Sequence, residues 1–159
     1  MKKLVIMRGI PGSGKSTLAT KRYPTAVVCS ADHYHMRNDP AGGAPIYDWK
    51  AENQGAAHRF CQSRCELAMQ RDEPLVLIDN TNIKRRDFAP YVAMAGVYGY
   101  EVVVHEVLVK TAQQLATCVQ RNVHRVPADV VCKMLLAFNQ EGFQPGQTLQ
   151  VVSEEMEGV

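Results

Sequence analysis

The sequence has little net charge and no long hydrophobic run. Its 159 residues include 18 Lys and Arg against 16 Asp and Glu, a formal charge of +2. Proteins that bind nucleic acids or membranes through bulk charge usually carry a larger basic excess, so any such partner must be recognised at a local site. The 46% hydrophobic share, without repeats or low-complexity segments, excludes collagen-like, disordered and transmembrane classes. We therefore expect residues 1–159 to form a single domain.

Cysteines are few and irregularly spaced. The five cysteines are an odd number, and their spacing matches no disulfide framework. The N-terminal segment MKKLVIM has only four apolar residues in a row before Arg8, well short of a signal-peptide core. These features predict a reduced, cytoplasmic protein, in the host cytoplasm if it is viral. They indicate no membrane partner and no obligate protein partner.

Four short apolar runs predict strands. They are Leu4–Met7, Ala26–Cys29, Leu75–Ile78 and Glu101–Val107. Their apolar residues are continuous, a pattern typical of parallel strands that helices bury on both faces. Helical periodicity occupies the intervals. This order predicts an α/β fold with three layers and a doubly wound, mostly parallel sheet of four or five strands, with ligands at the carboxyl ends of the strands.

Helix signals are clearest in the C-terminal half. Thr111 and Gln114 form a capping box for a helix that runs to about Arg121, and Pro127 with Asp129 begins another. Apolar stripes at 57–69 and 88–95 predict two earlier helices.

Two segments are less regular. Residues 37–48 contain two prolines and two glycines and predict a long irregular insertion after a strand, where loops usually line sites. In the tail, residues 148–159, TLQVV is compatible with an edge strand and SEEMEGV with a frayed acidic end.

Residues 9–17, GIPGSGKST, match the phosphate-binding pattern G-x-x-x-x-G-K-[ST] between a predicted strand and a predicted helix. In such a P-loop, backbone N–H groups and the helix N-terminus surround phosphates. Lys15 would reach the β- and γ-phosphates, and the Ser16 hydroxyl would take one Mg²⁺ position. The predicted cofactors are ATP and Mg²⁺. The predicted nucleotide-binding residues are Gly12, Ser13, Gly14, Lys15, Ser16, Thr17, Arg121 and Arg125.

A phosphate-binding loop alone does not separate kinases from other nucleotide hydrolases. The guanine-reading pattern N-K-x-D is missing, which excludes GTPases, and ring-forming ATPases need an added helical domain. The sequence therefore predicts the P-loop NTPase fold of a small ATP-dependent kinase.

Two carboxylates follow predicted strands at the edge next to the P-loop. Asp32 is placed to accept a proton from an attacking hydroxyl, with a turn or helix-cap role as the alternative. Asp79 ends the third predicted strand and predicts a Mg²⁺ ligand acting through water, with a structural hydrogen bond as the alternative. The predicted metal residues are thus Ser16 and Asp79.

Arginines lie on the connection between the last two predicted helices, at about 118–128. Arg121 and Arg125 predict a lid that neutralises charge on the transferring phosphoryl group, with a solvated helix end as the alternative. The predicted catalytic residues are Lys15, Asp32 and Arg125.

Aromatic and basic residues interleave around the insertion and include Tyr34, Tyr47 and Trp49. They predict a surface that stacks bases and contacts phosphate, or else Tyr34 and Trp49 close the core. The run 84–86 (KRR) either follows an acceptor phosphate or begins a helix.

Histidines and cysteines offer no convincing metal site. His58, Cys61 and Cys65 share a helical face, but no fourth ligand follows at a zinc-like spacing, which favours core packing. His105 lies within a predicted strand and is expected to be buried with a hydrogen-bond partner.

Four blocks occur together, in the order GIPGSGKST, SADHY, DNTN and RNVHRVP. In order and spacing they resemble the kinase module of phage polynucleotide kinase and its cellular relatives, including the kinase domain of Nedd4-binding proteins. The resemblance covers about residues 1–140. The stretch 79–91 and the Asn-x-His of residues 122–124 look most similar to the cellular branch.

The resemblance implies transfer of the ATP γ-phosphate to a 5′-hydroxyl of DNA or RNA. By position, Asp32 matches the general base of that family and Arg125 matches an arginine that clamps the phosphates. The substrate-binding residues predicted from the resemblance and from neighbouring basic side chains are His35, Arg37, Asn80, Thr81, Asn82 and Arg85.

One departure concerns the acceptor. Phage polynucleotide kinase has an arginine three residues after the general base, where this chain has His35, with Arg37 nearby. A viral DNA base kinase that phosphorylates hydroxymethyluracil is therefore the first alternative. A small-metabolite kinase and an ATP-dependent binding module follow.

Overall fold

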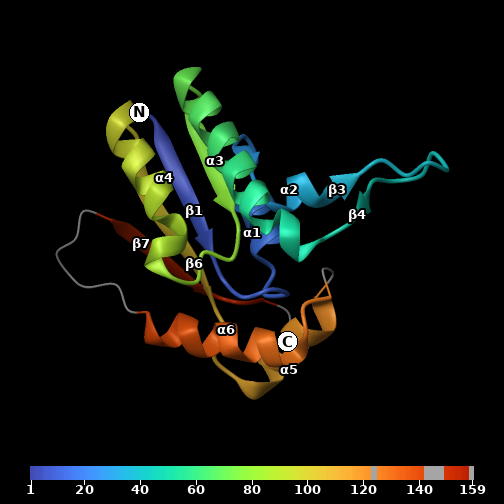
Figure 1. Ribbon diagram of the computed structural model, residues 1–159. Helices are drawn as coiled ribbons and strands as arrows, with labels where there is room; N and C mark the ends of the chain where they lie inside the picture. Colours follow the sequence, from blue (N-terminus) through green and yellow to red (C-terminus); the bar gives the residue numbers. More distant parts are fainter. Residues whose placement is uncertain (123–124, 142–148, 158–159) are drawn as a thin grey trace.

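A five-stranded parallel sheet forms the centre of the computed structural model, which describes residues 1–122, 125–141 and 149–157 (Figure 1). The strand order is β2–β5–β1–β6–β7, and every neighbouring pair is parallel. The strands are β1 (Lys3–Arg8), β2 (Val27–Cys29), β5 (Leu75–Asp79), β6 (Glu101–Leu108) and β7 (Gln150–Glu155). This arrangement confirms the predicted α/β fold.

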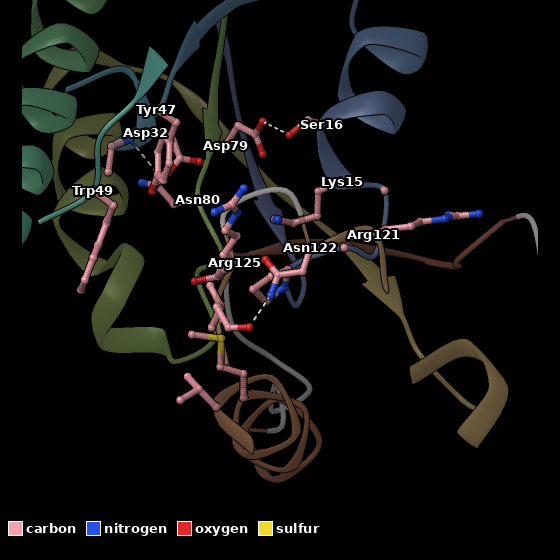
Figure 2. Close-up of a pocket in the computed structure, with 18 of the residues that line it drawn as sticks. Lys15, Ser16, Asp32, Tyr47, Trp49, Asp79, Asn80, Arg121, Asn122 and Arg125 are labelled. Atoms are coloured by element: carbon pink, nitrogen blue, oxygen red, sulfur yellow. Dashed lines mark hydrogen bonds between the residues drawn. The ribbon is translucent and has the colours of Figure 1, made fainter. Parts of the chain in front are cut away.

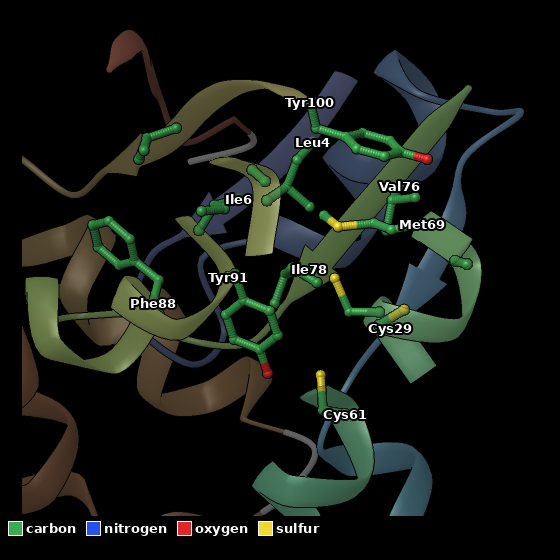
Figure 3. Close-up of a cluster of buried hydrophobic side chains, with 14 residues drawn as sticks. Leu4, Ile6, Cys29, Cys61, Met69, Val76, Ile78, Phe88, Tyr91 and Tyr100 are labelled. Carbon is green, nitrogen blue, oxygen red and sulfur yellow. The ribbon is translucent and has the colours of Figure 1, made fainter. Parts of the chain in front are cut away.

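Helices cover both faces of the sheet. On one face lie α3 (Gln54–Gln70) and α4 (Arg85–Tyr98); on the other lie α1 (Lys15–Arg22), α5 (Ala112–Arg121) and α6 (Ala128–Gln140). Side chains of a strand alternate between faces. Leu4 and Ile6 of β1 therefore join the first core, with α3 and α4, whereas Val5 and Met7 join the second (Figure 3 shows the first core).

The helix signals of the sequence are confirmed. The Thr111 hydroxyl accepts a hydrogen bond from the Gln114 N–H at 3.1 Å, the Gln114 side chain accepts one from the Thr111 N–H at 3.0 Å, and α5 ends at Arg121. Pro127 caps α6. Helix α4 continues through Gly96 and ends at Tyr98, and its C-cap Gly99 adopts the left-handed conformation that suits glycine.

The insertion is more regular than predicted. After the short helix α2 (Asp32–His35), β3 (Met36–Arg37) pairs antiparallel with β4 (Ile46–Tyr47) and forms a hairpin that projects from the sheet (Figure 1). A 3₁₀ turn, η1 (Ala51–Asn53), leads into α3. The prediction of an irregular segment holds for residues 38–45 and is wrong for the paired residues at its ends, because cross-strand pairing of two-residue strands leaves no periodic pattern in the sequence.

The described part of the tail, residues 149–157, confirms the edge strand. β7 pairs with β6 from Val103↔Gln150 to Leu108↔Glu155. The frayed acidic end is wrong for this part, because Met156 is buried and its N–H donates to the Leu108 carbonyl at 2.9 Å. Residues 148, 158 and 159 lie outside the described ranges.

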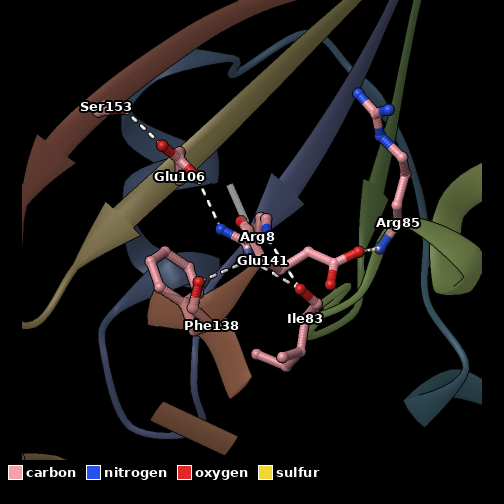
Figure 4. Close-up of polar contacts among 7 residues, drawn as sticks. All are labelled: Arg8, Ile83, Arg85, Glu106, Phe138, Glu141 and Ser153. Atoms are coloured by element: carbon pink, nitrogen blue, oxygen red, sulfur yellow. Dashed lines mark hydrogen bonds and ion pairs between the residues drawn. The ribbon is translucent and has the colours of Figure 1, made fainter. Parts of the chain in front are cut away.

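A buried arginine connects β1 to β6, to α6 and to the loop before α4. The Arg8 guanidinium, 1% exposed, donates to Glu106 of β6 at 2.7 Å and to the carbonyls of Ile83 and Phe138 at 2.7 and 3.1 Å (Figure 4). It also lies 3.8 Å from the centroid of the Phe138 ring. Burial lowers the pKa of Arg8, and the hydrogen bond to Glu106 opposes that shift. Because Arg8 directly precedes the P-loop, this network fixes the loop's first residue against α6.

The cysteines and histidines of the sheet behave as the sequence indicates. All five cysteines are free, and burial raises the pKa of the Cys29 and Cys65 thiols to about 12, which leaves them unreactive. His105 is buried and hydrogen-bonds to the Tyr23 hydroxyl at 2.8 Å and to Glu154 at 2.6 Å, as predicted. In the described ranges, no helix has both the length and the apolar character of a membrane span.

Candidate functional site

The P-loop conformation depends on two glycines with positive φ. Gly12 has φ 79°, and a Cβ there would lie 2.1 Å from the carbonyl oxygen of Cys118, so the loop packs on α5 more closely than any side chain permits. Gly14, at φ 87°, is the N-cap of α1 and makes no side-chain cap. The first turn of α1 holds no acidic residue. Its N–H groups and positive dipole end are therefore suited to an anion.

One pocket of about 760 Å³ lies at the carboxyl ends of the strands, next to the P-loop (Figure 2). It brings together most of the residues that the sequence predicts. These are Gly12, Gly14, Lys15, Ser16, Thr17, Asp32, Asp79, Asn80, Thr81, Arg121 and Arg125. The volume is in the usual range for a small-molecule site.

Ser16 and Asp79 form the polar end of this pocket. The Ser16 hydroxyl donates to Asp79 Oδ2 at 2.6 Å, which joins the start of α1 to the end of β5 (Figure 2). Mg²⁺ prefers oxygen ligands and is usually held by one or two carboxylates together with substrate phosphates and water. A hydroxyl and a carboxylate beside a phosphate-binding loop fit that requirement.

Asp32 begins α2, and its carboxylate lies in the pocket. The Tyr47 hydroxyl donates to Asp32 Oδ1 at 3.2 Å, from the second strand of the hairpin. Burial, with a smaller contribution from Asp32, raises the pKa of Tyr47, which keeps this hydroxyl protonated. The N-cap of α2 is Ala31 rather than Asp32, and no side chain caps this helix, so the Asp32 carboxylate does not act as a helix cap.

The three residues after Asp79 connect strands to one another. Asn80 Oδ1 accepts from the Ala31 N–H at 2.9 Å, and the Thr81 carbonyl accepts from the Gly9 N–H at 3.0 Å. Asn82 is buried, and its amide donates to the Met7 carbonyl at 2.7 Å. Asn80 and Thr81 line the pocket, whereas Asn82 binds the end of β1, just before the P-loop.

The described part of the predicted lid, between α5 and α6, brings arginines to the pocket. Arg125 adopts φ 55°, a conformation that costs a non-glycine residue about 1–2 kcal/mol. Its N–H donates to the Asn122 carbonyl at 3.2 Å, and the Asn122 amide donates to the Val126 carbonyl at 2.6 Å. In Figure 2 the Arg125 guanidinium lies between Asn80 and Lys15, while the Arg121 side chain extends away from them. Residues 123 and 124, including the histidine of the Asn-x-His motif, lie outside the described residues.

Five predicted site residues do not line the pocket. His35 is 3% exposed, and its Nε2 lies 3.1 Å from Gln54 Oε1, so its side chain packs behind the pocket lining and its substrate contact stays a prediction. Arg37 lies on the hairpin and pairs with Asp48 at 3.1 Å. The other three are Ser13 and Asn82, both buried, and Arg85, whose N–H donates to Glu141 at 3.0 Å. Their burial and pairing arise from tertiary contacts that local sequence does not show.

Several lining residues were missed as site residues. Tyr47 and Trp49 belong to the predicted base-stacking surface but not to the predicted site residues. Both line the pocket, and Trp49 is 50% exposed, which excludes the alternative that it closes the core. Gln54 and His58 also line the pocket, one turn apart at the start of α3. The four-residue spacing of Gln54 and His58 is a sequence signal for two polar side chains on one helical face. His58 is considered above only as a metal ligand with Cys61 and Cys65, and these two cysteines lie in the core.

Comparison with known proteins places this site in a family. The AAA_33 family, described as an AAA domain, matches residues 4–141. The chain belongs to this AAA domain family. Its P-loop and five-stranded parallel sheet give this family member the fold of P-loop kinases.

One of two curated relatives bears out the predicted resemblance to Nedd4-binding proteins. Human NEDD4-binding protein 2 is 32% identical over 135 residues, which are 83% of this chain and 7% of that protein. A 2′,3′-cyclic-nucleotide 3′-phosphodiesterase from Pongo abelii is 34% identical over 139 residues, 84% of this chain and 30% of that protein. The chain thus spans only a minor part of each relative. The specific likeness to phage polynucleotide kinase stays a prediction.

A solved structure supports the fold. The crystal structure of a gluconokinase from Sinorhizobium meliloti 1021 superposes with a TM-score of 0.61 at 14% identity and covers 99% of this chain and 84% of that one. At this identity the likeness concerns the fold alone.

Proposed function

We propose that this protein transfers the γ-phosphate of ATP to a hydroxyl of a nucleic acid, first of all a 5′-terminal hydroxyl. The observation that carries the proposal is the single pocket that contains Lys15, Ser16 and the Asp32 carboxylate. The combination of blocks that resembles polynucleotide kinases supports a polynucleotide acceptor. One relative is also named for a nucleotide substrate, a 2′,3′-cyclic nucleotide.

Each of four pocket side chains has a role in the proposed phosphoryl transfer. Asp32 accepts the proton of the acceptor hydroxyl as that oxygen forms a bond to the γ-phosphorus and the bond to the bridging oxygen of ADP breaks. The hydrogen bond from Tyr47 orients the Asp32 carboxylate for this transfer. Lys15 and Arg125, both at the pocket, stabilise the charge that develops on the phosphoryl oxygens.

Ser16 and Asp79 would hold Mg²⁺, Ser16 directly and Asp79 through water. When bound, the ion neutralises charge on the β- and γ-phosphate oxygens. Without it, the hydrogen bond between Ser16 and Asp79 keeps the two ligands together.

Label transfer from γ-labelled ATP tests the proposal with a panel of acceptors. The panel contains a 5′-hydroxyl oligonucleotide, the same oligonucleotide with a 5′-phosphate, a 5′-blocked duplex with hydroxymethyluracil, and gluconate. We expect label on the first acceptor only, and none with the Lys15→Ala variant, which controls for contaminating kinases. Label on the duplex alone or on gluconate alone would replace the proposed acceptor. Hydrolysis with no labelled acceptor would favour an ATP-dependent binding module.

A further inference from the structure

Trp49, the only tryptophan of the chain, lies at the acceptor side of the pocket. Half of its surface is exposed, although tryptophan is usually highly buried. In Figure 2 it lies on the same side as Tyr47 and Asp32, across the pocket from Lys15. An exposed indole at this place suggests a contact surface for the acceptor.

Hydrogen bonds fix the indole ring. Trp49 Nε1 donates to Gln54 Oε1 at 2.9 Å, and Gln54 Nε2 lies 3.1 Å from His58 Nε2. Because an indole N–H can only donate, the oxygen of the Gln54 amide must be the atom beside it. The amide nitrogen then donates to His58, so the orientation of Gln54 is set from both ends.

A buried histidine lies beside the same ring. The His35 ring centroid lies 6.3 Å from that of Trp49 and 5.8 Å from that of Tyr47, and His35 Nε2 also reaches Gln54 Oε1. Tyr47 in turn donates to the Asp32 carboxylate. His35 therefore packs both on the indole and on the tyrosine that hydrogen-bonds to the proposed general base.

We propose that Trp49 is a stacking platform for the base of the acceptor's terminal nucleotide, and that Gln54 and His35 are its positioning residues. The inference rests on the proposed function, because it places that base beside the hydroxyl that Asp32 deprotonates. The N–H of the indole already donates to Gln54, so the ring presents only its aromatic face to a base and makes no hydrogen bond that would distinguish one base from another. The acceptor site should thus accept any base and prefer purines, which stack more strongly.

Intrinsic fluorescence tests the platform directly, since the emission of the chain's single tryptophan reports on position 49 alone. Without ATP, a short oligonucleotide with a 5′-hydroxyl and a 5′-terminal adenosine should quench this emission saturably. The same oligonucleotide with an abasic 5′ residue should bind at least several-fold more weakly. Equal affinity of the two, or binding without quenching, would overturn the platform.

Kinetics of variants supply the second test. Trp49→Ala should raise KM for the oligonucleotide by about 5- to 150-fold, the range expected for loss of one stacked base, with kcat and the KM for ATP nearly unchanged. Trp49→Phe should retain most of the affinity, and Gln54→Leu should fall between the two. Val97→Ala, an exposed apolar site on α4, is the matched control.

The outcomes separate this inference from the proposed function. Quenching by the adenosine-ended oligonucleotide without phosphate transfer would keep the platform and refute the reaction. Phosphate transfer with an unchanged oligonucleotide KM in Trp49→Ala would keep the reaction and refute the platform.

Discussion

The two sides of the pocket are built in different ways. On the donor side, the P-loop follows a buried strand, and its shape depends on backbone conformation at Gly12 and Gly14. On the acceptor side, Tyr47–Asp32 joins a hairpin of two-residue strands to a four-residue helix, and Trp49–Gln54 joins the segment after the hairpin to α3. Changes on the donor side should therefore disturb the fold or the chemistry. Changes on the acceptor side should alter acceptor binding or proton transfer and leave the fold and ATP binding intact.

The largest expected effect separates charge from backbone at Arg125. Arg125→Ala should lower kcat by about 10³-fold or more, the usual effect of losing an arginine that stabilises the transition state. Arg125→Gly should be equally inactive. It should be the more stable of the two by up to about 1–2 kcal/mol, because glycine adopts φ 55° without strain. Steady-state kinetics and thermal unfolding measure both effects, and an active Arg125→Gly enzyme would remove Arg125 from the chemistry.

Two glycine substitutions sharpen the claim about the donor side. Both positions have positive φ, but a Cβ at Gly12 would collide with the Cys118 carbonyl, whereas a Cβ at Gly14 meets nothing within 4 Å. Gly14→Ala should thus cost about 1–2 kcal/mol of unfolding free energy, and Gly12→Ala clearly more. Denaturant unfolding would measure the two costs. Equal costs would show that packing on α5 does not determine the loop.

A smaller effect is expected at Tyr47 on the acceptor side. Tyr47→Phe removes the hydrogen bond to Asp32 but keeps the ring that packs on His35. We expect kcat to fall roughly 5- to 15-fold, corresponding to about 1–1.5 kcal/mol, with the KM for ATP and the melting temperature nearly unchanged. A large change in the KM for ATP would contradict the separation of the two sides.

The smallest expected effect concerns stability, at a residue of β7 that belongs to neither the donor side nor the acceptor side of the pocket. The hydrogen bond from Arg22, followed by that from His105, lowers the pKa of Glu154. A lowered pKa adds stability above the ordinary carboxyl pKa, and this stability is lost as pH falls through the lowered value. Glu154→Gln should therefore flatten the acid limb of stability against pH. Neither KM should change at neutral pH, which chemical unfolding and kinetics at several pH values would check.

The same contrast explains what the sequence could predict. The P-loop, the strands and the Thr111 capping box depend on residues close in the chain, and the pattern at Thr111–Gln114 identified its contact correctly. His35 could not be placed in this way, because its burial depends on Gln54, nineteen residues later. Arg8 is similar: a charged residue at the end of a strand gives no local sign that Glu106 and Phe138 will enclose it.

The central claim is that one pocket joins the nucleotide phosphates to an acceptor hydroxyl that Asp32 deprotonates. The most direct test measures ATP binding and label transfer to a 5′-hydroxyl oligonucleotide for the Asp32→Ala variant beside the unchanged protein. We expect ATP to bind both with similar affinity and label transfer to be lost in the variant. Full transfer by Asp32→Ala would contradict the account.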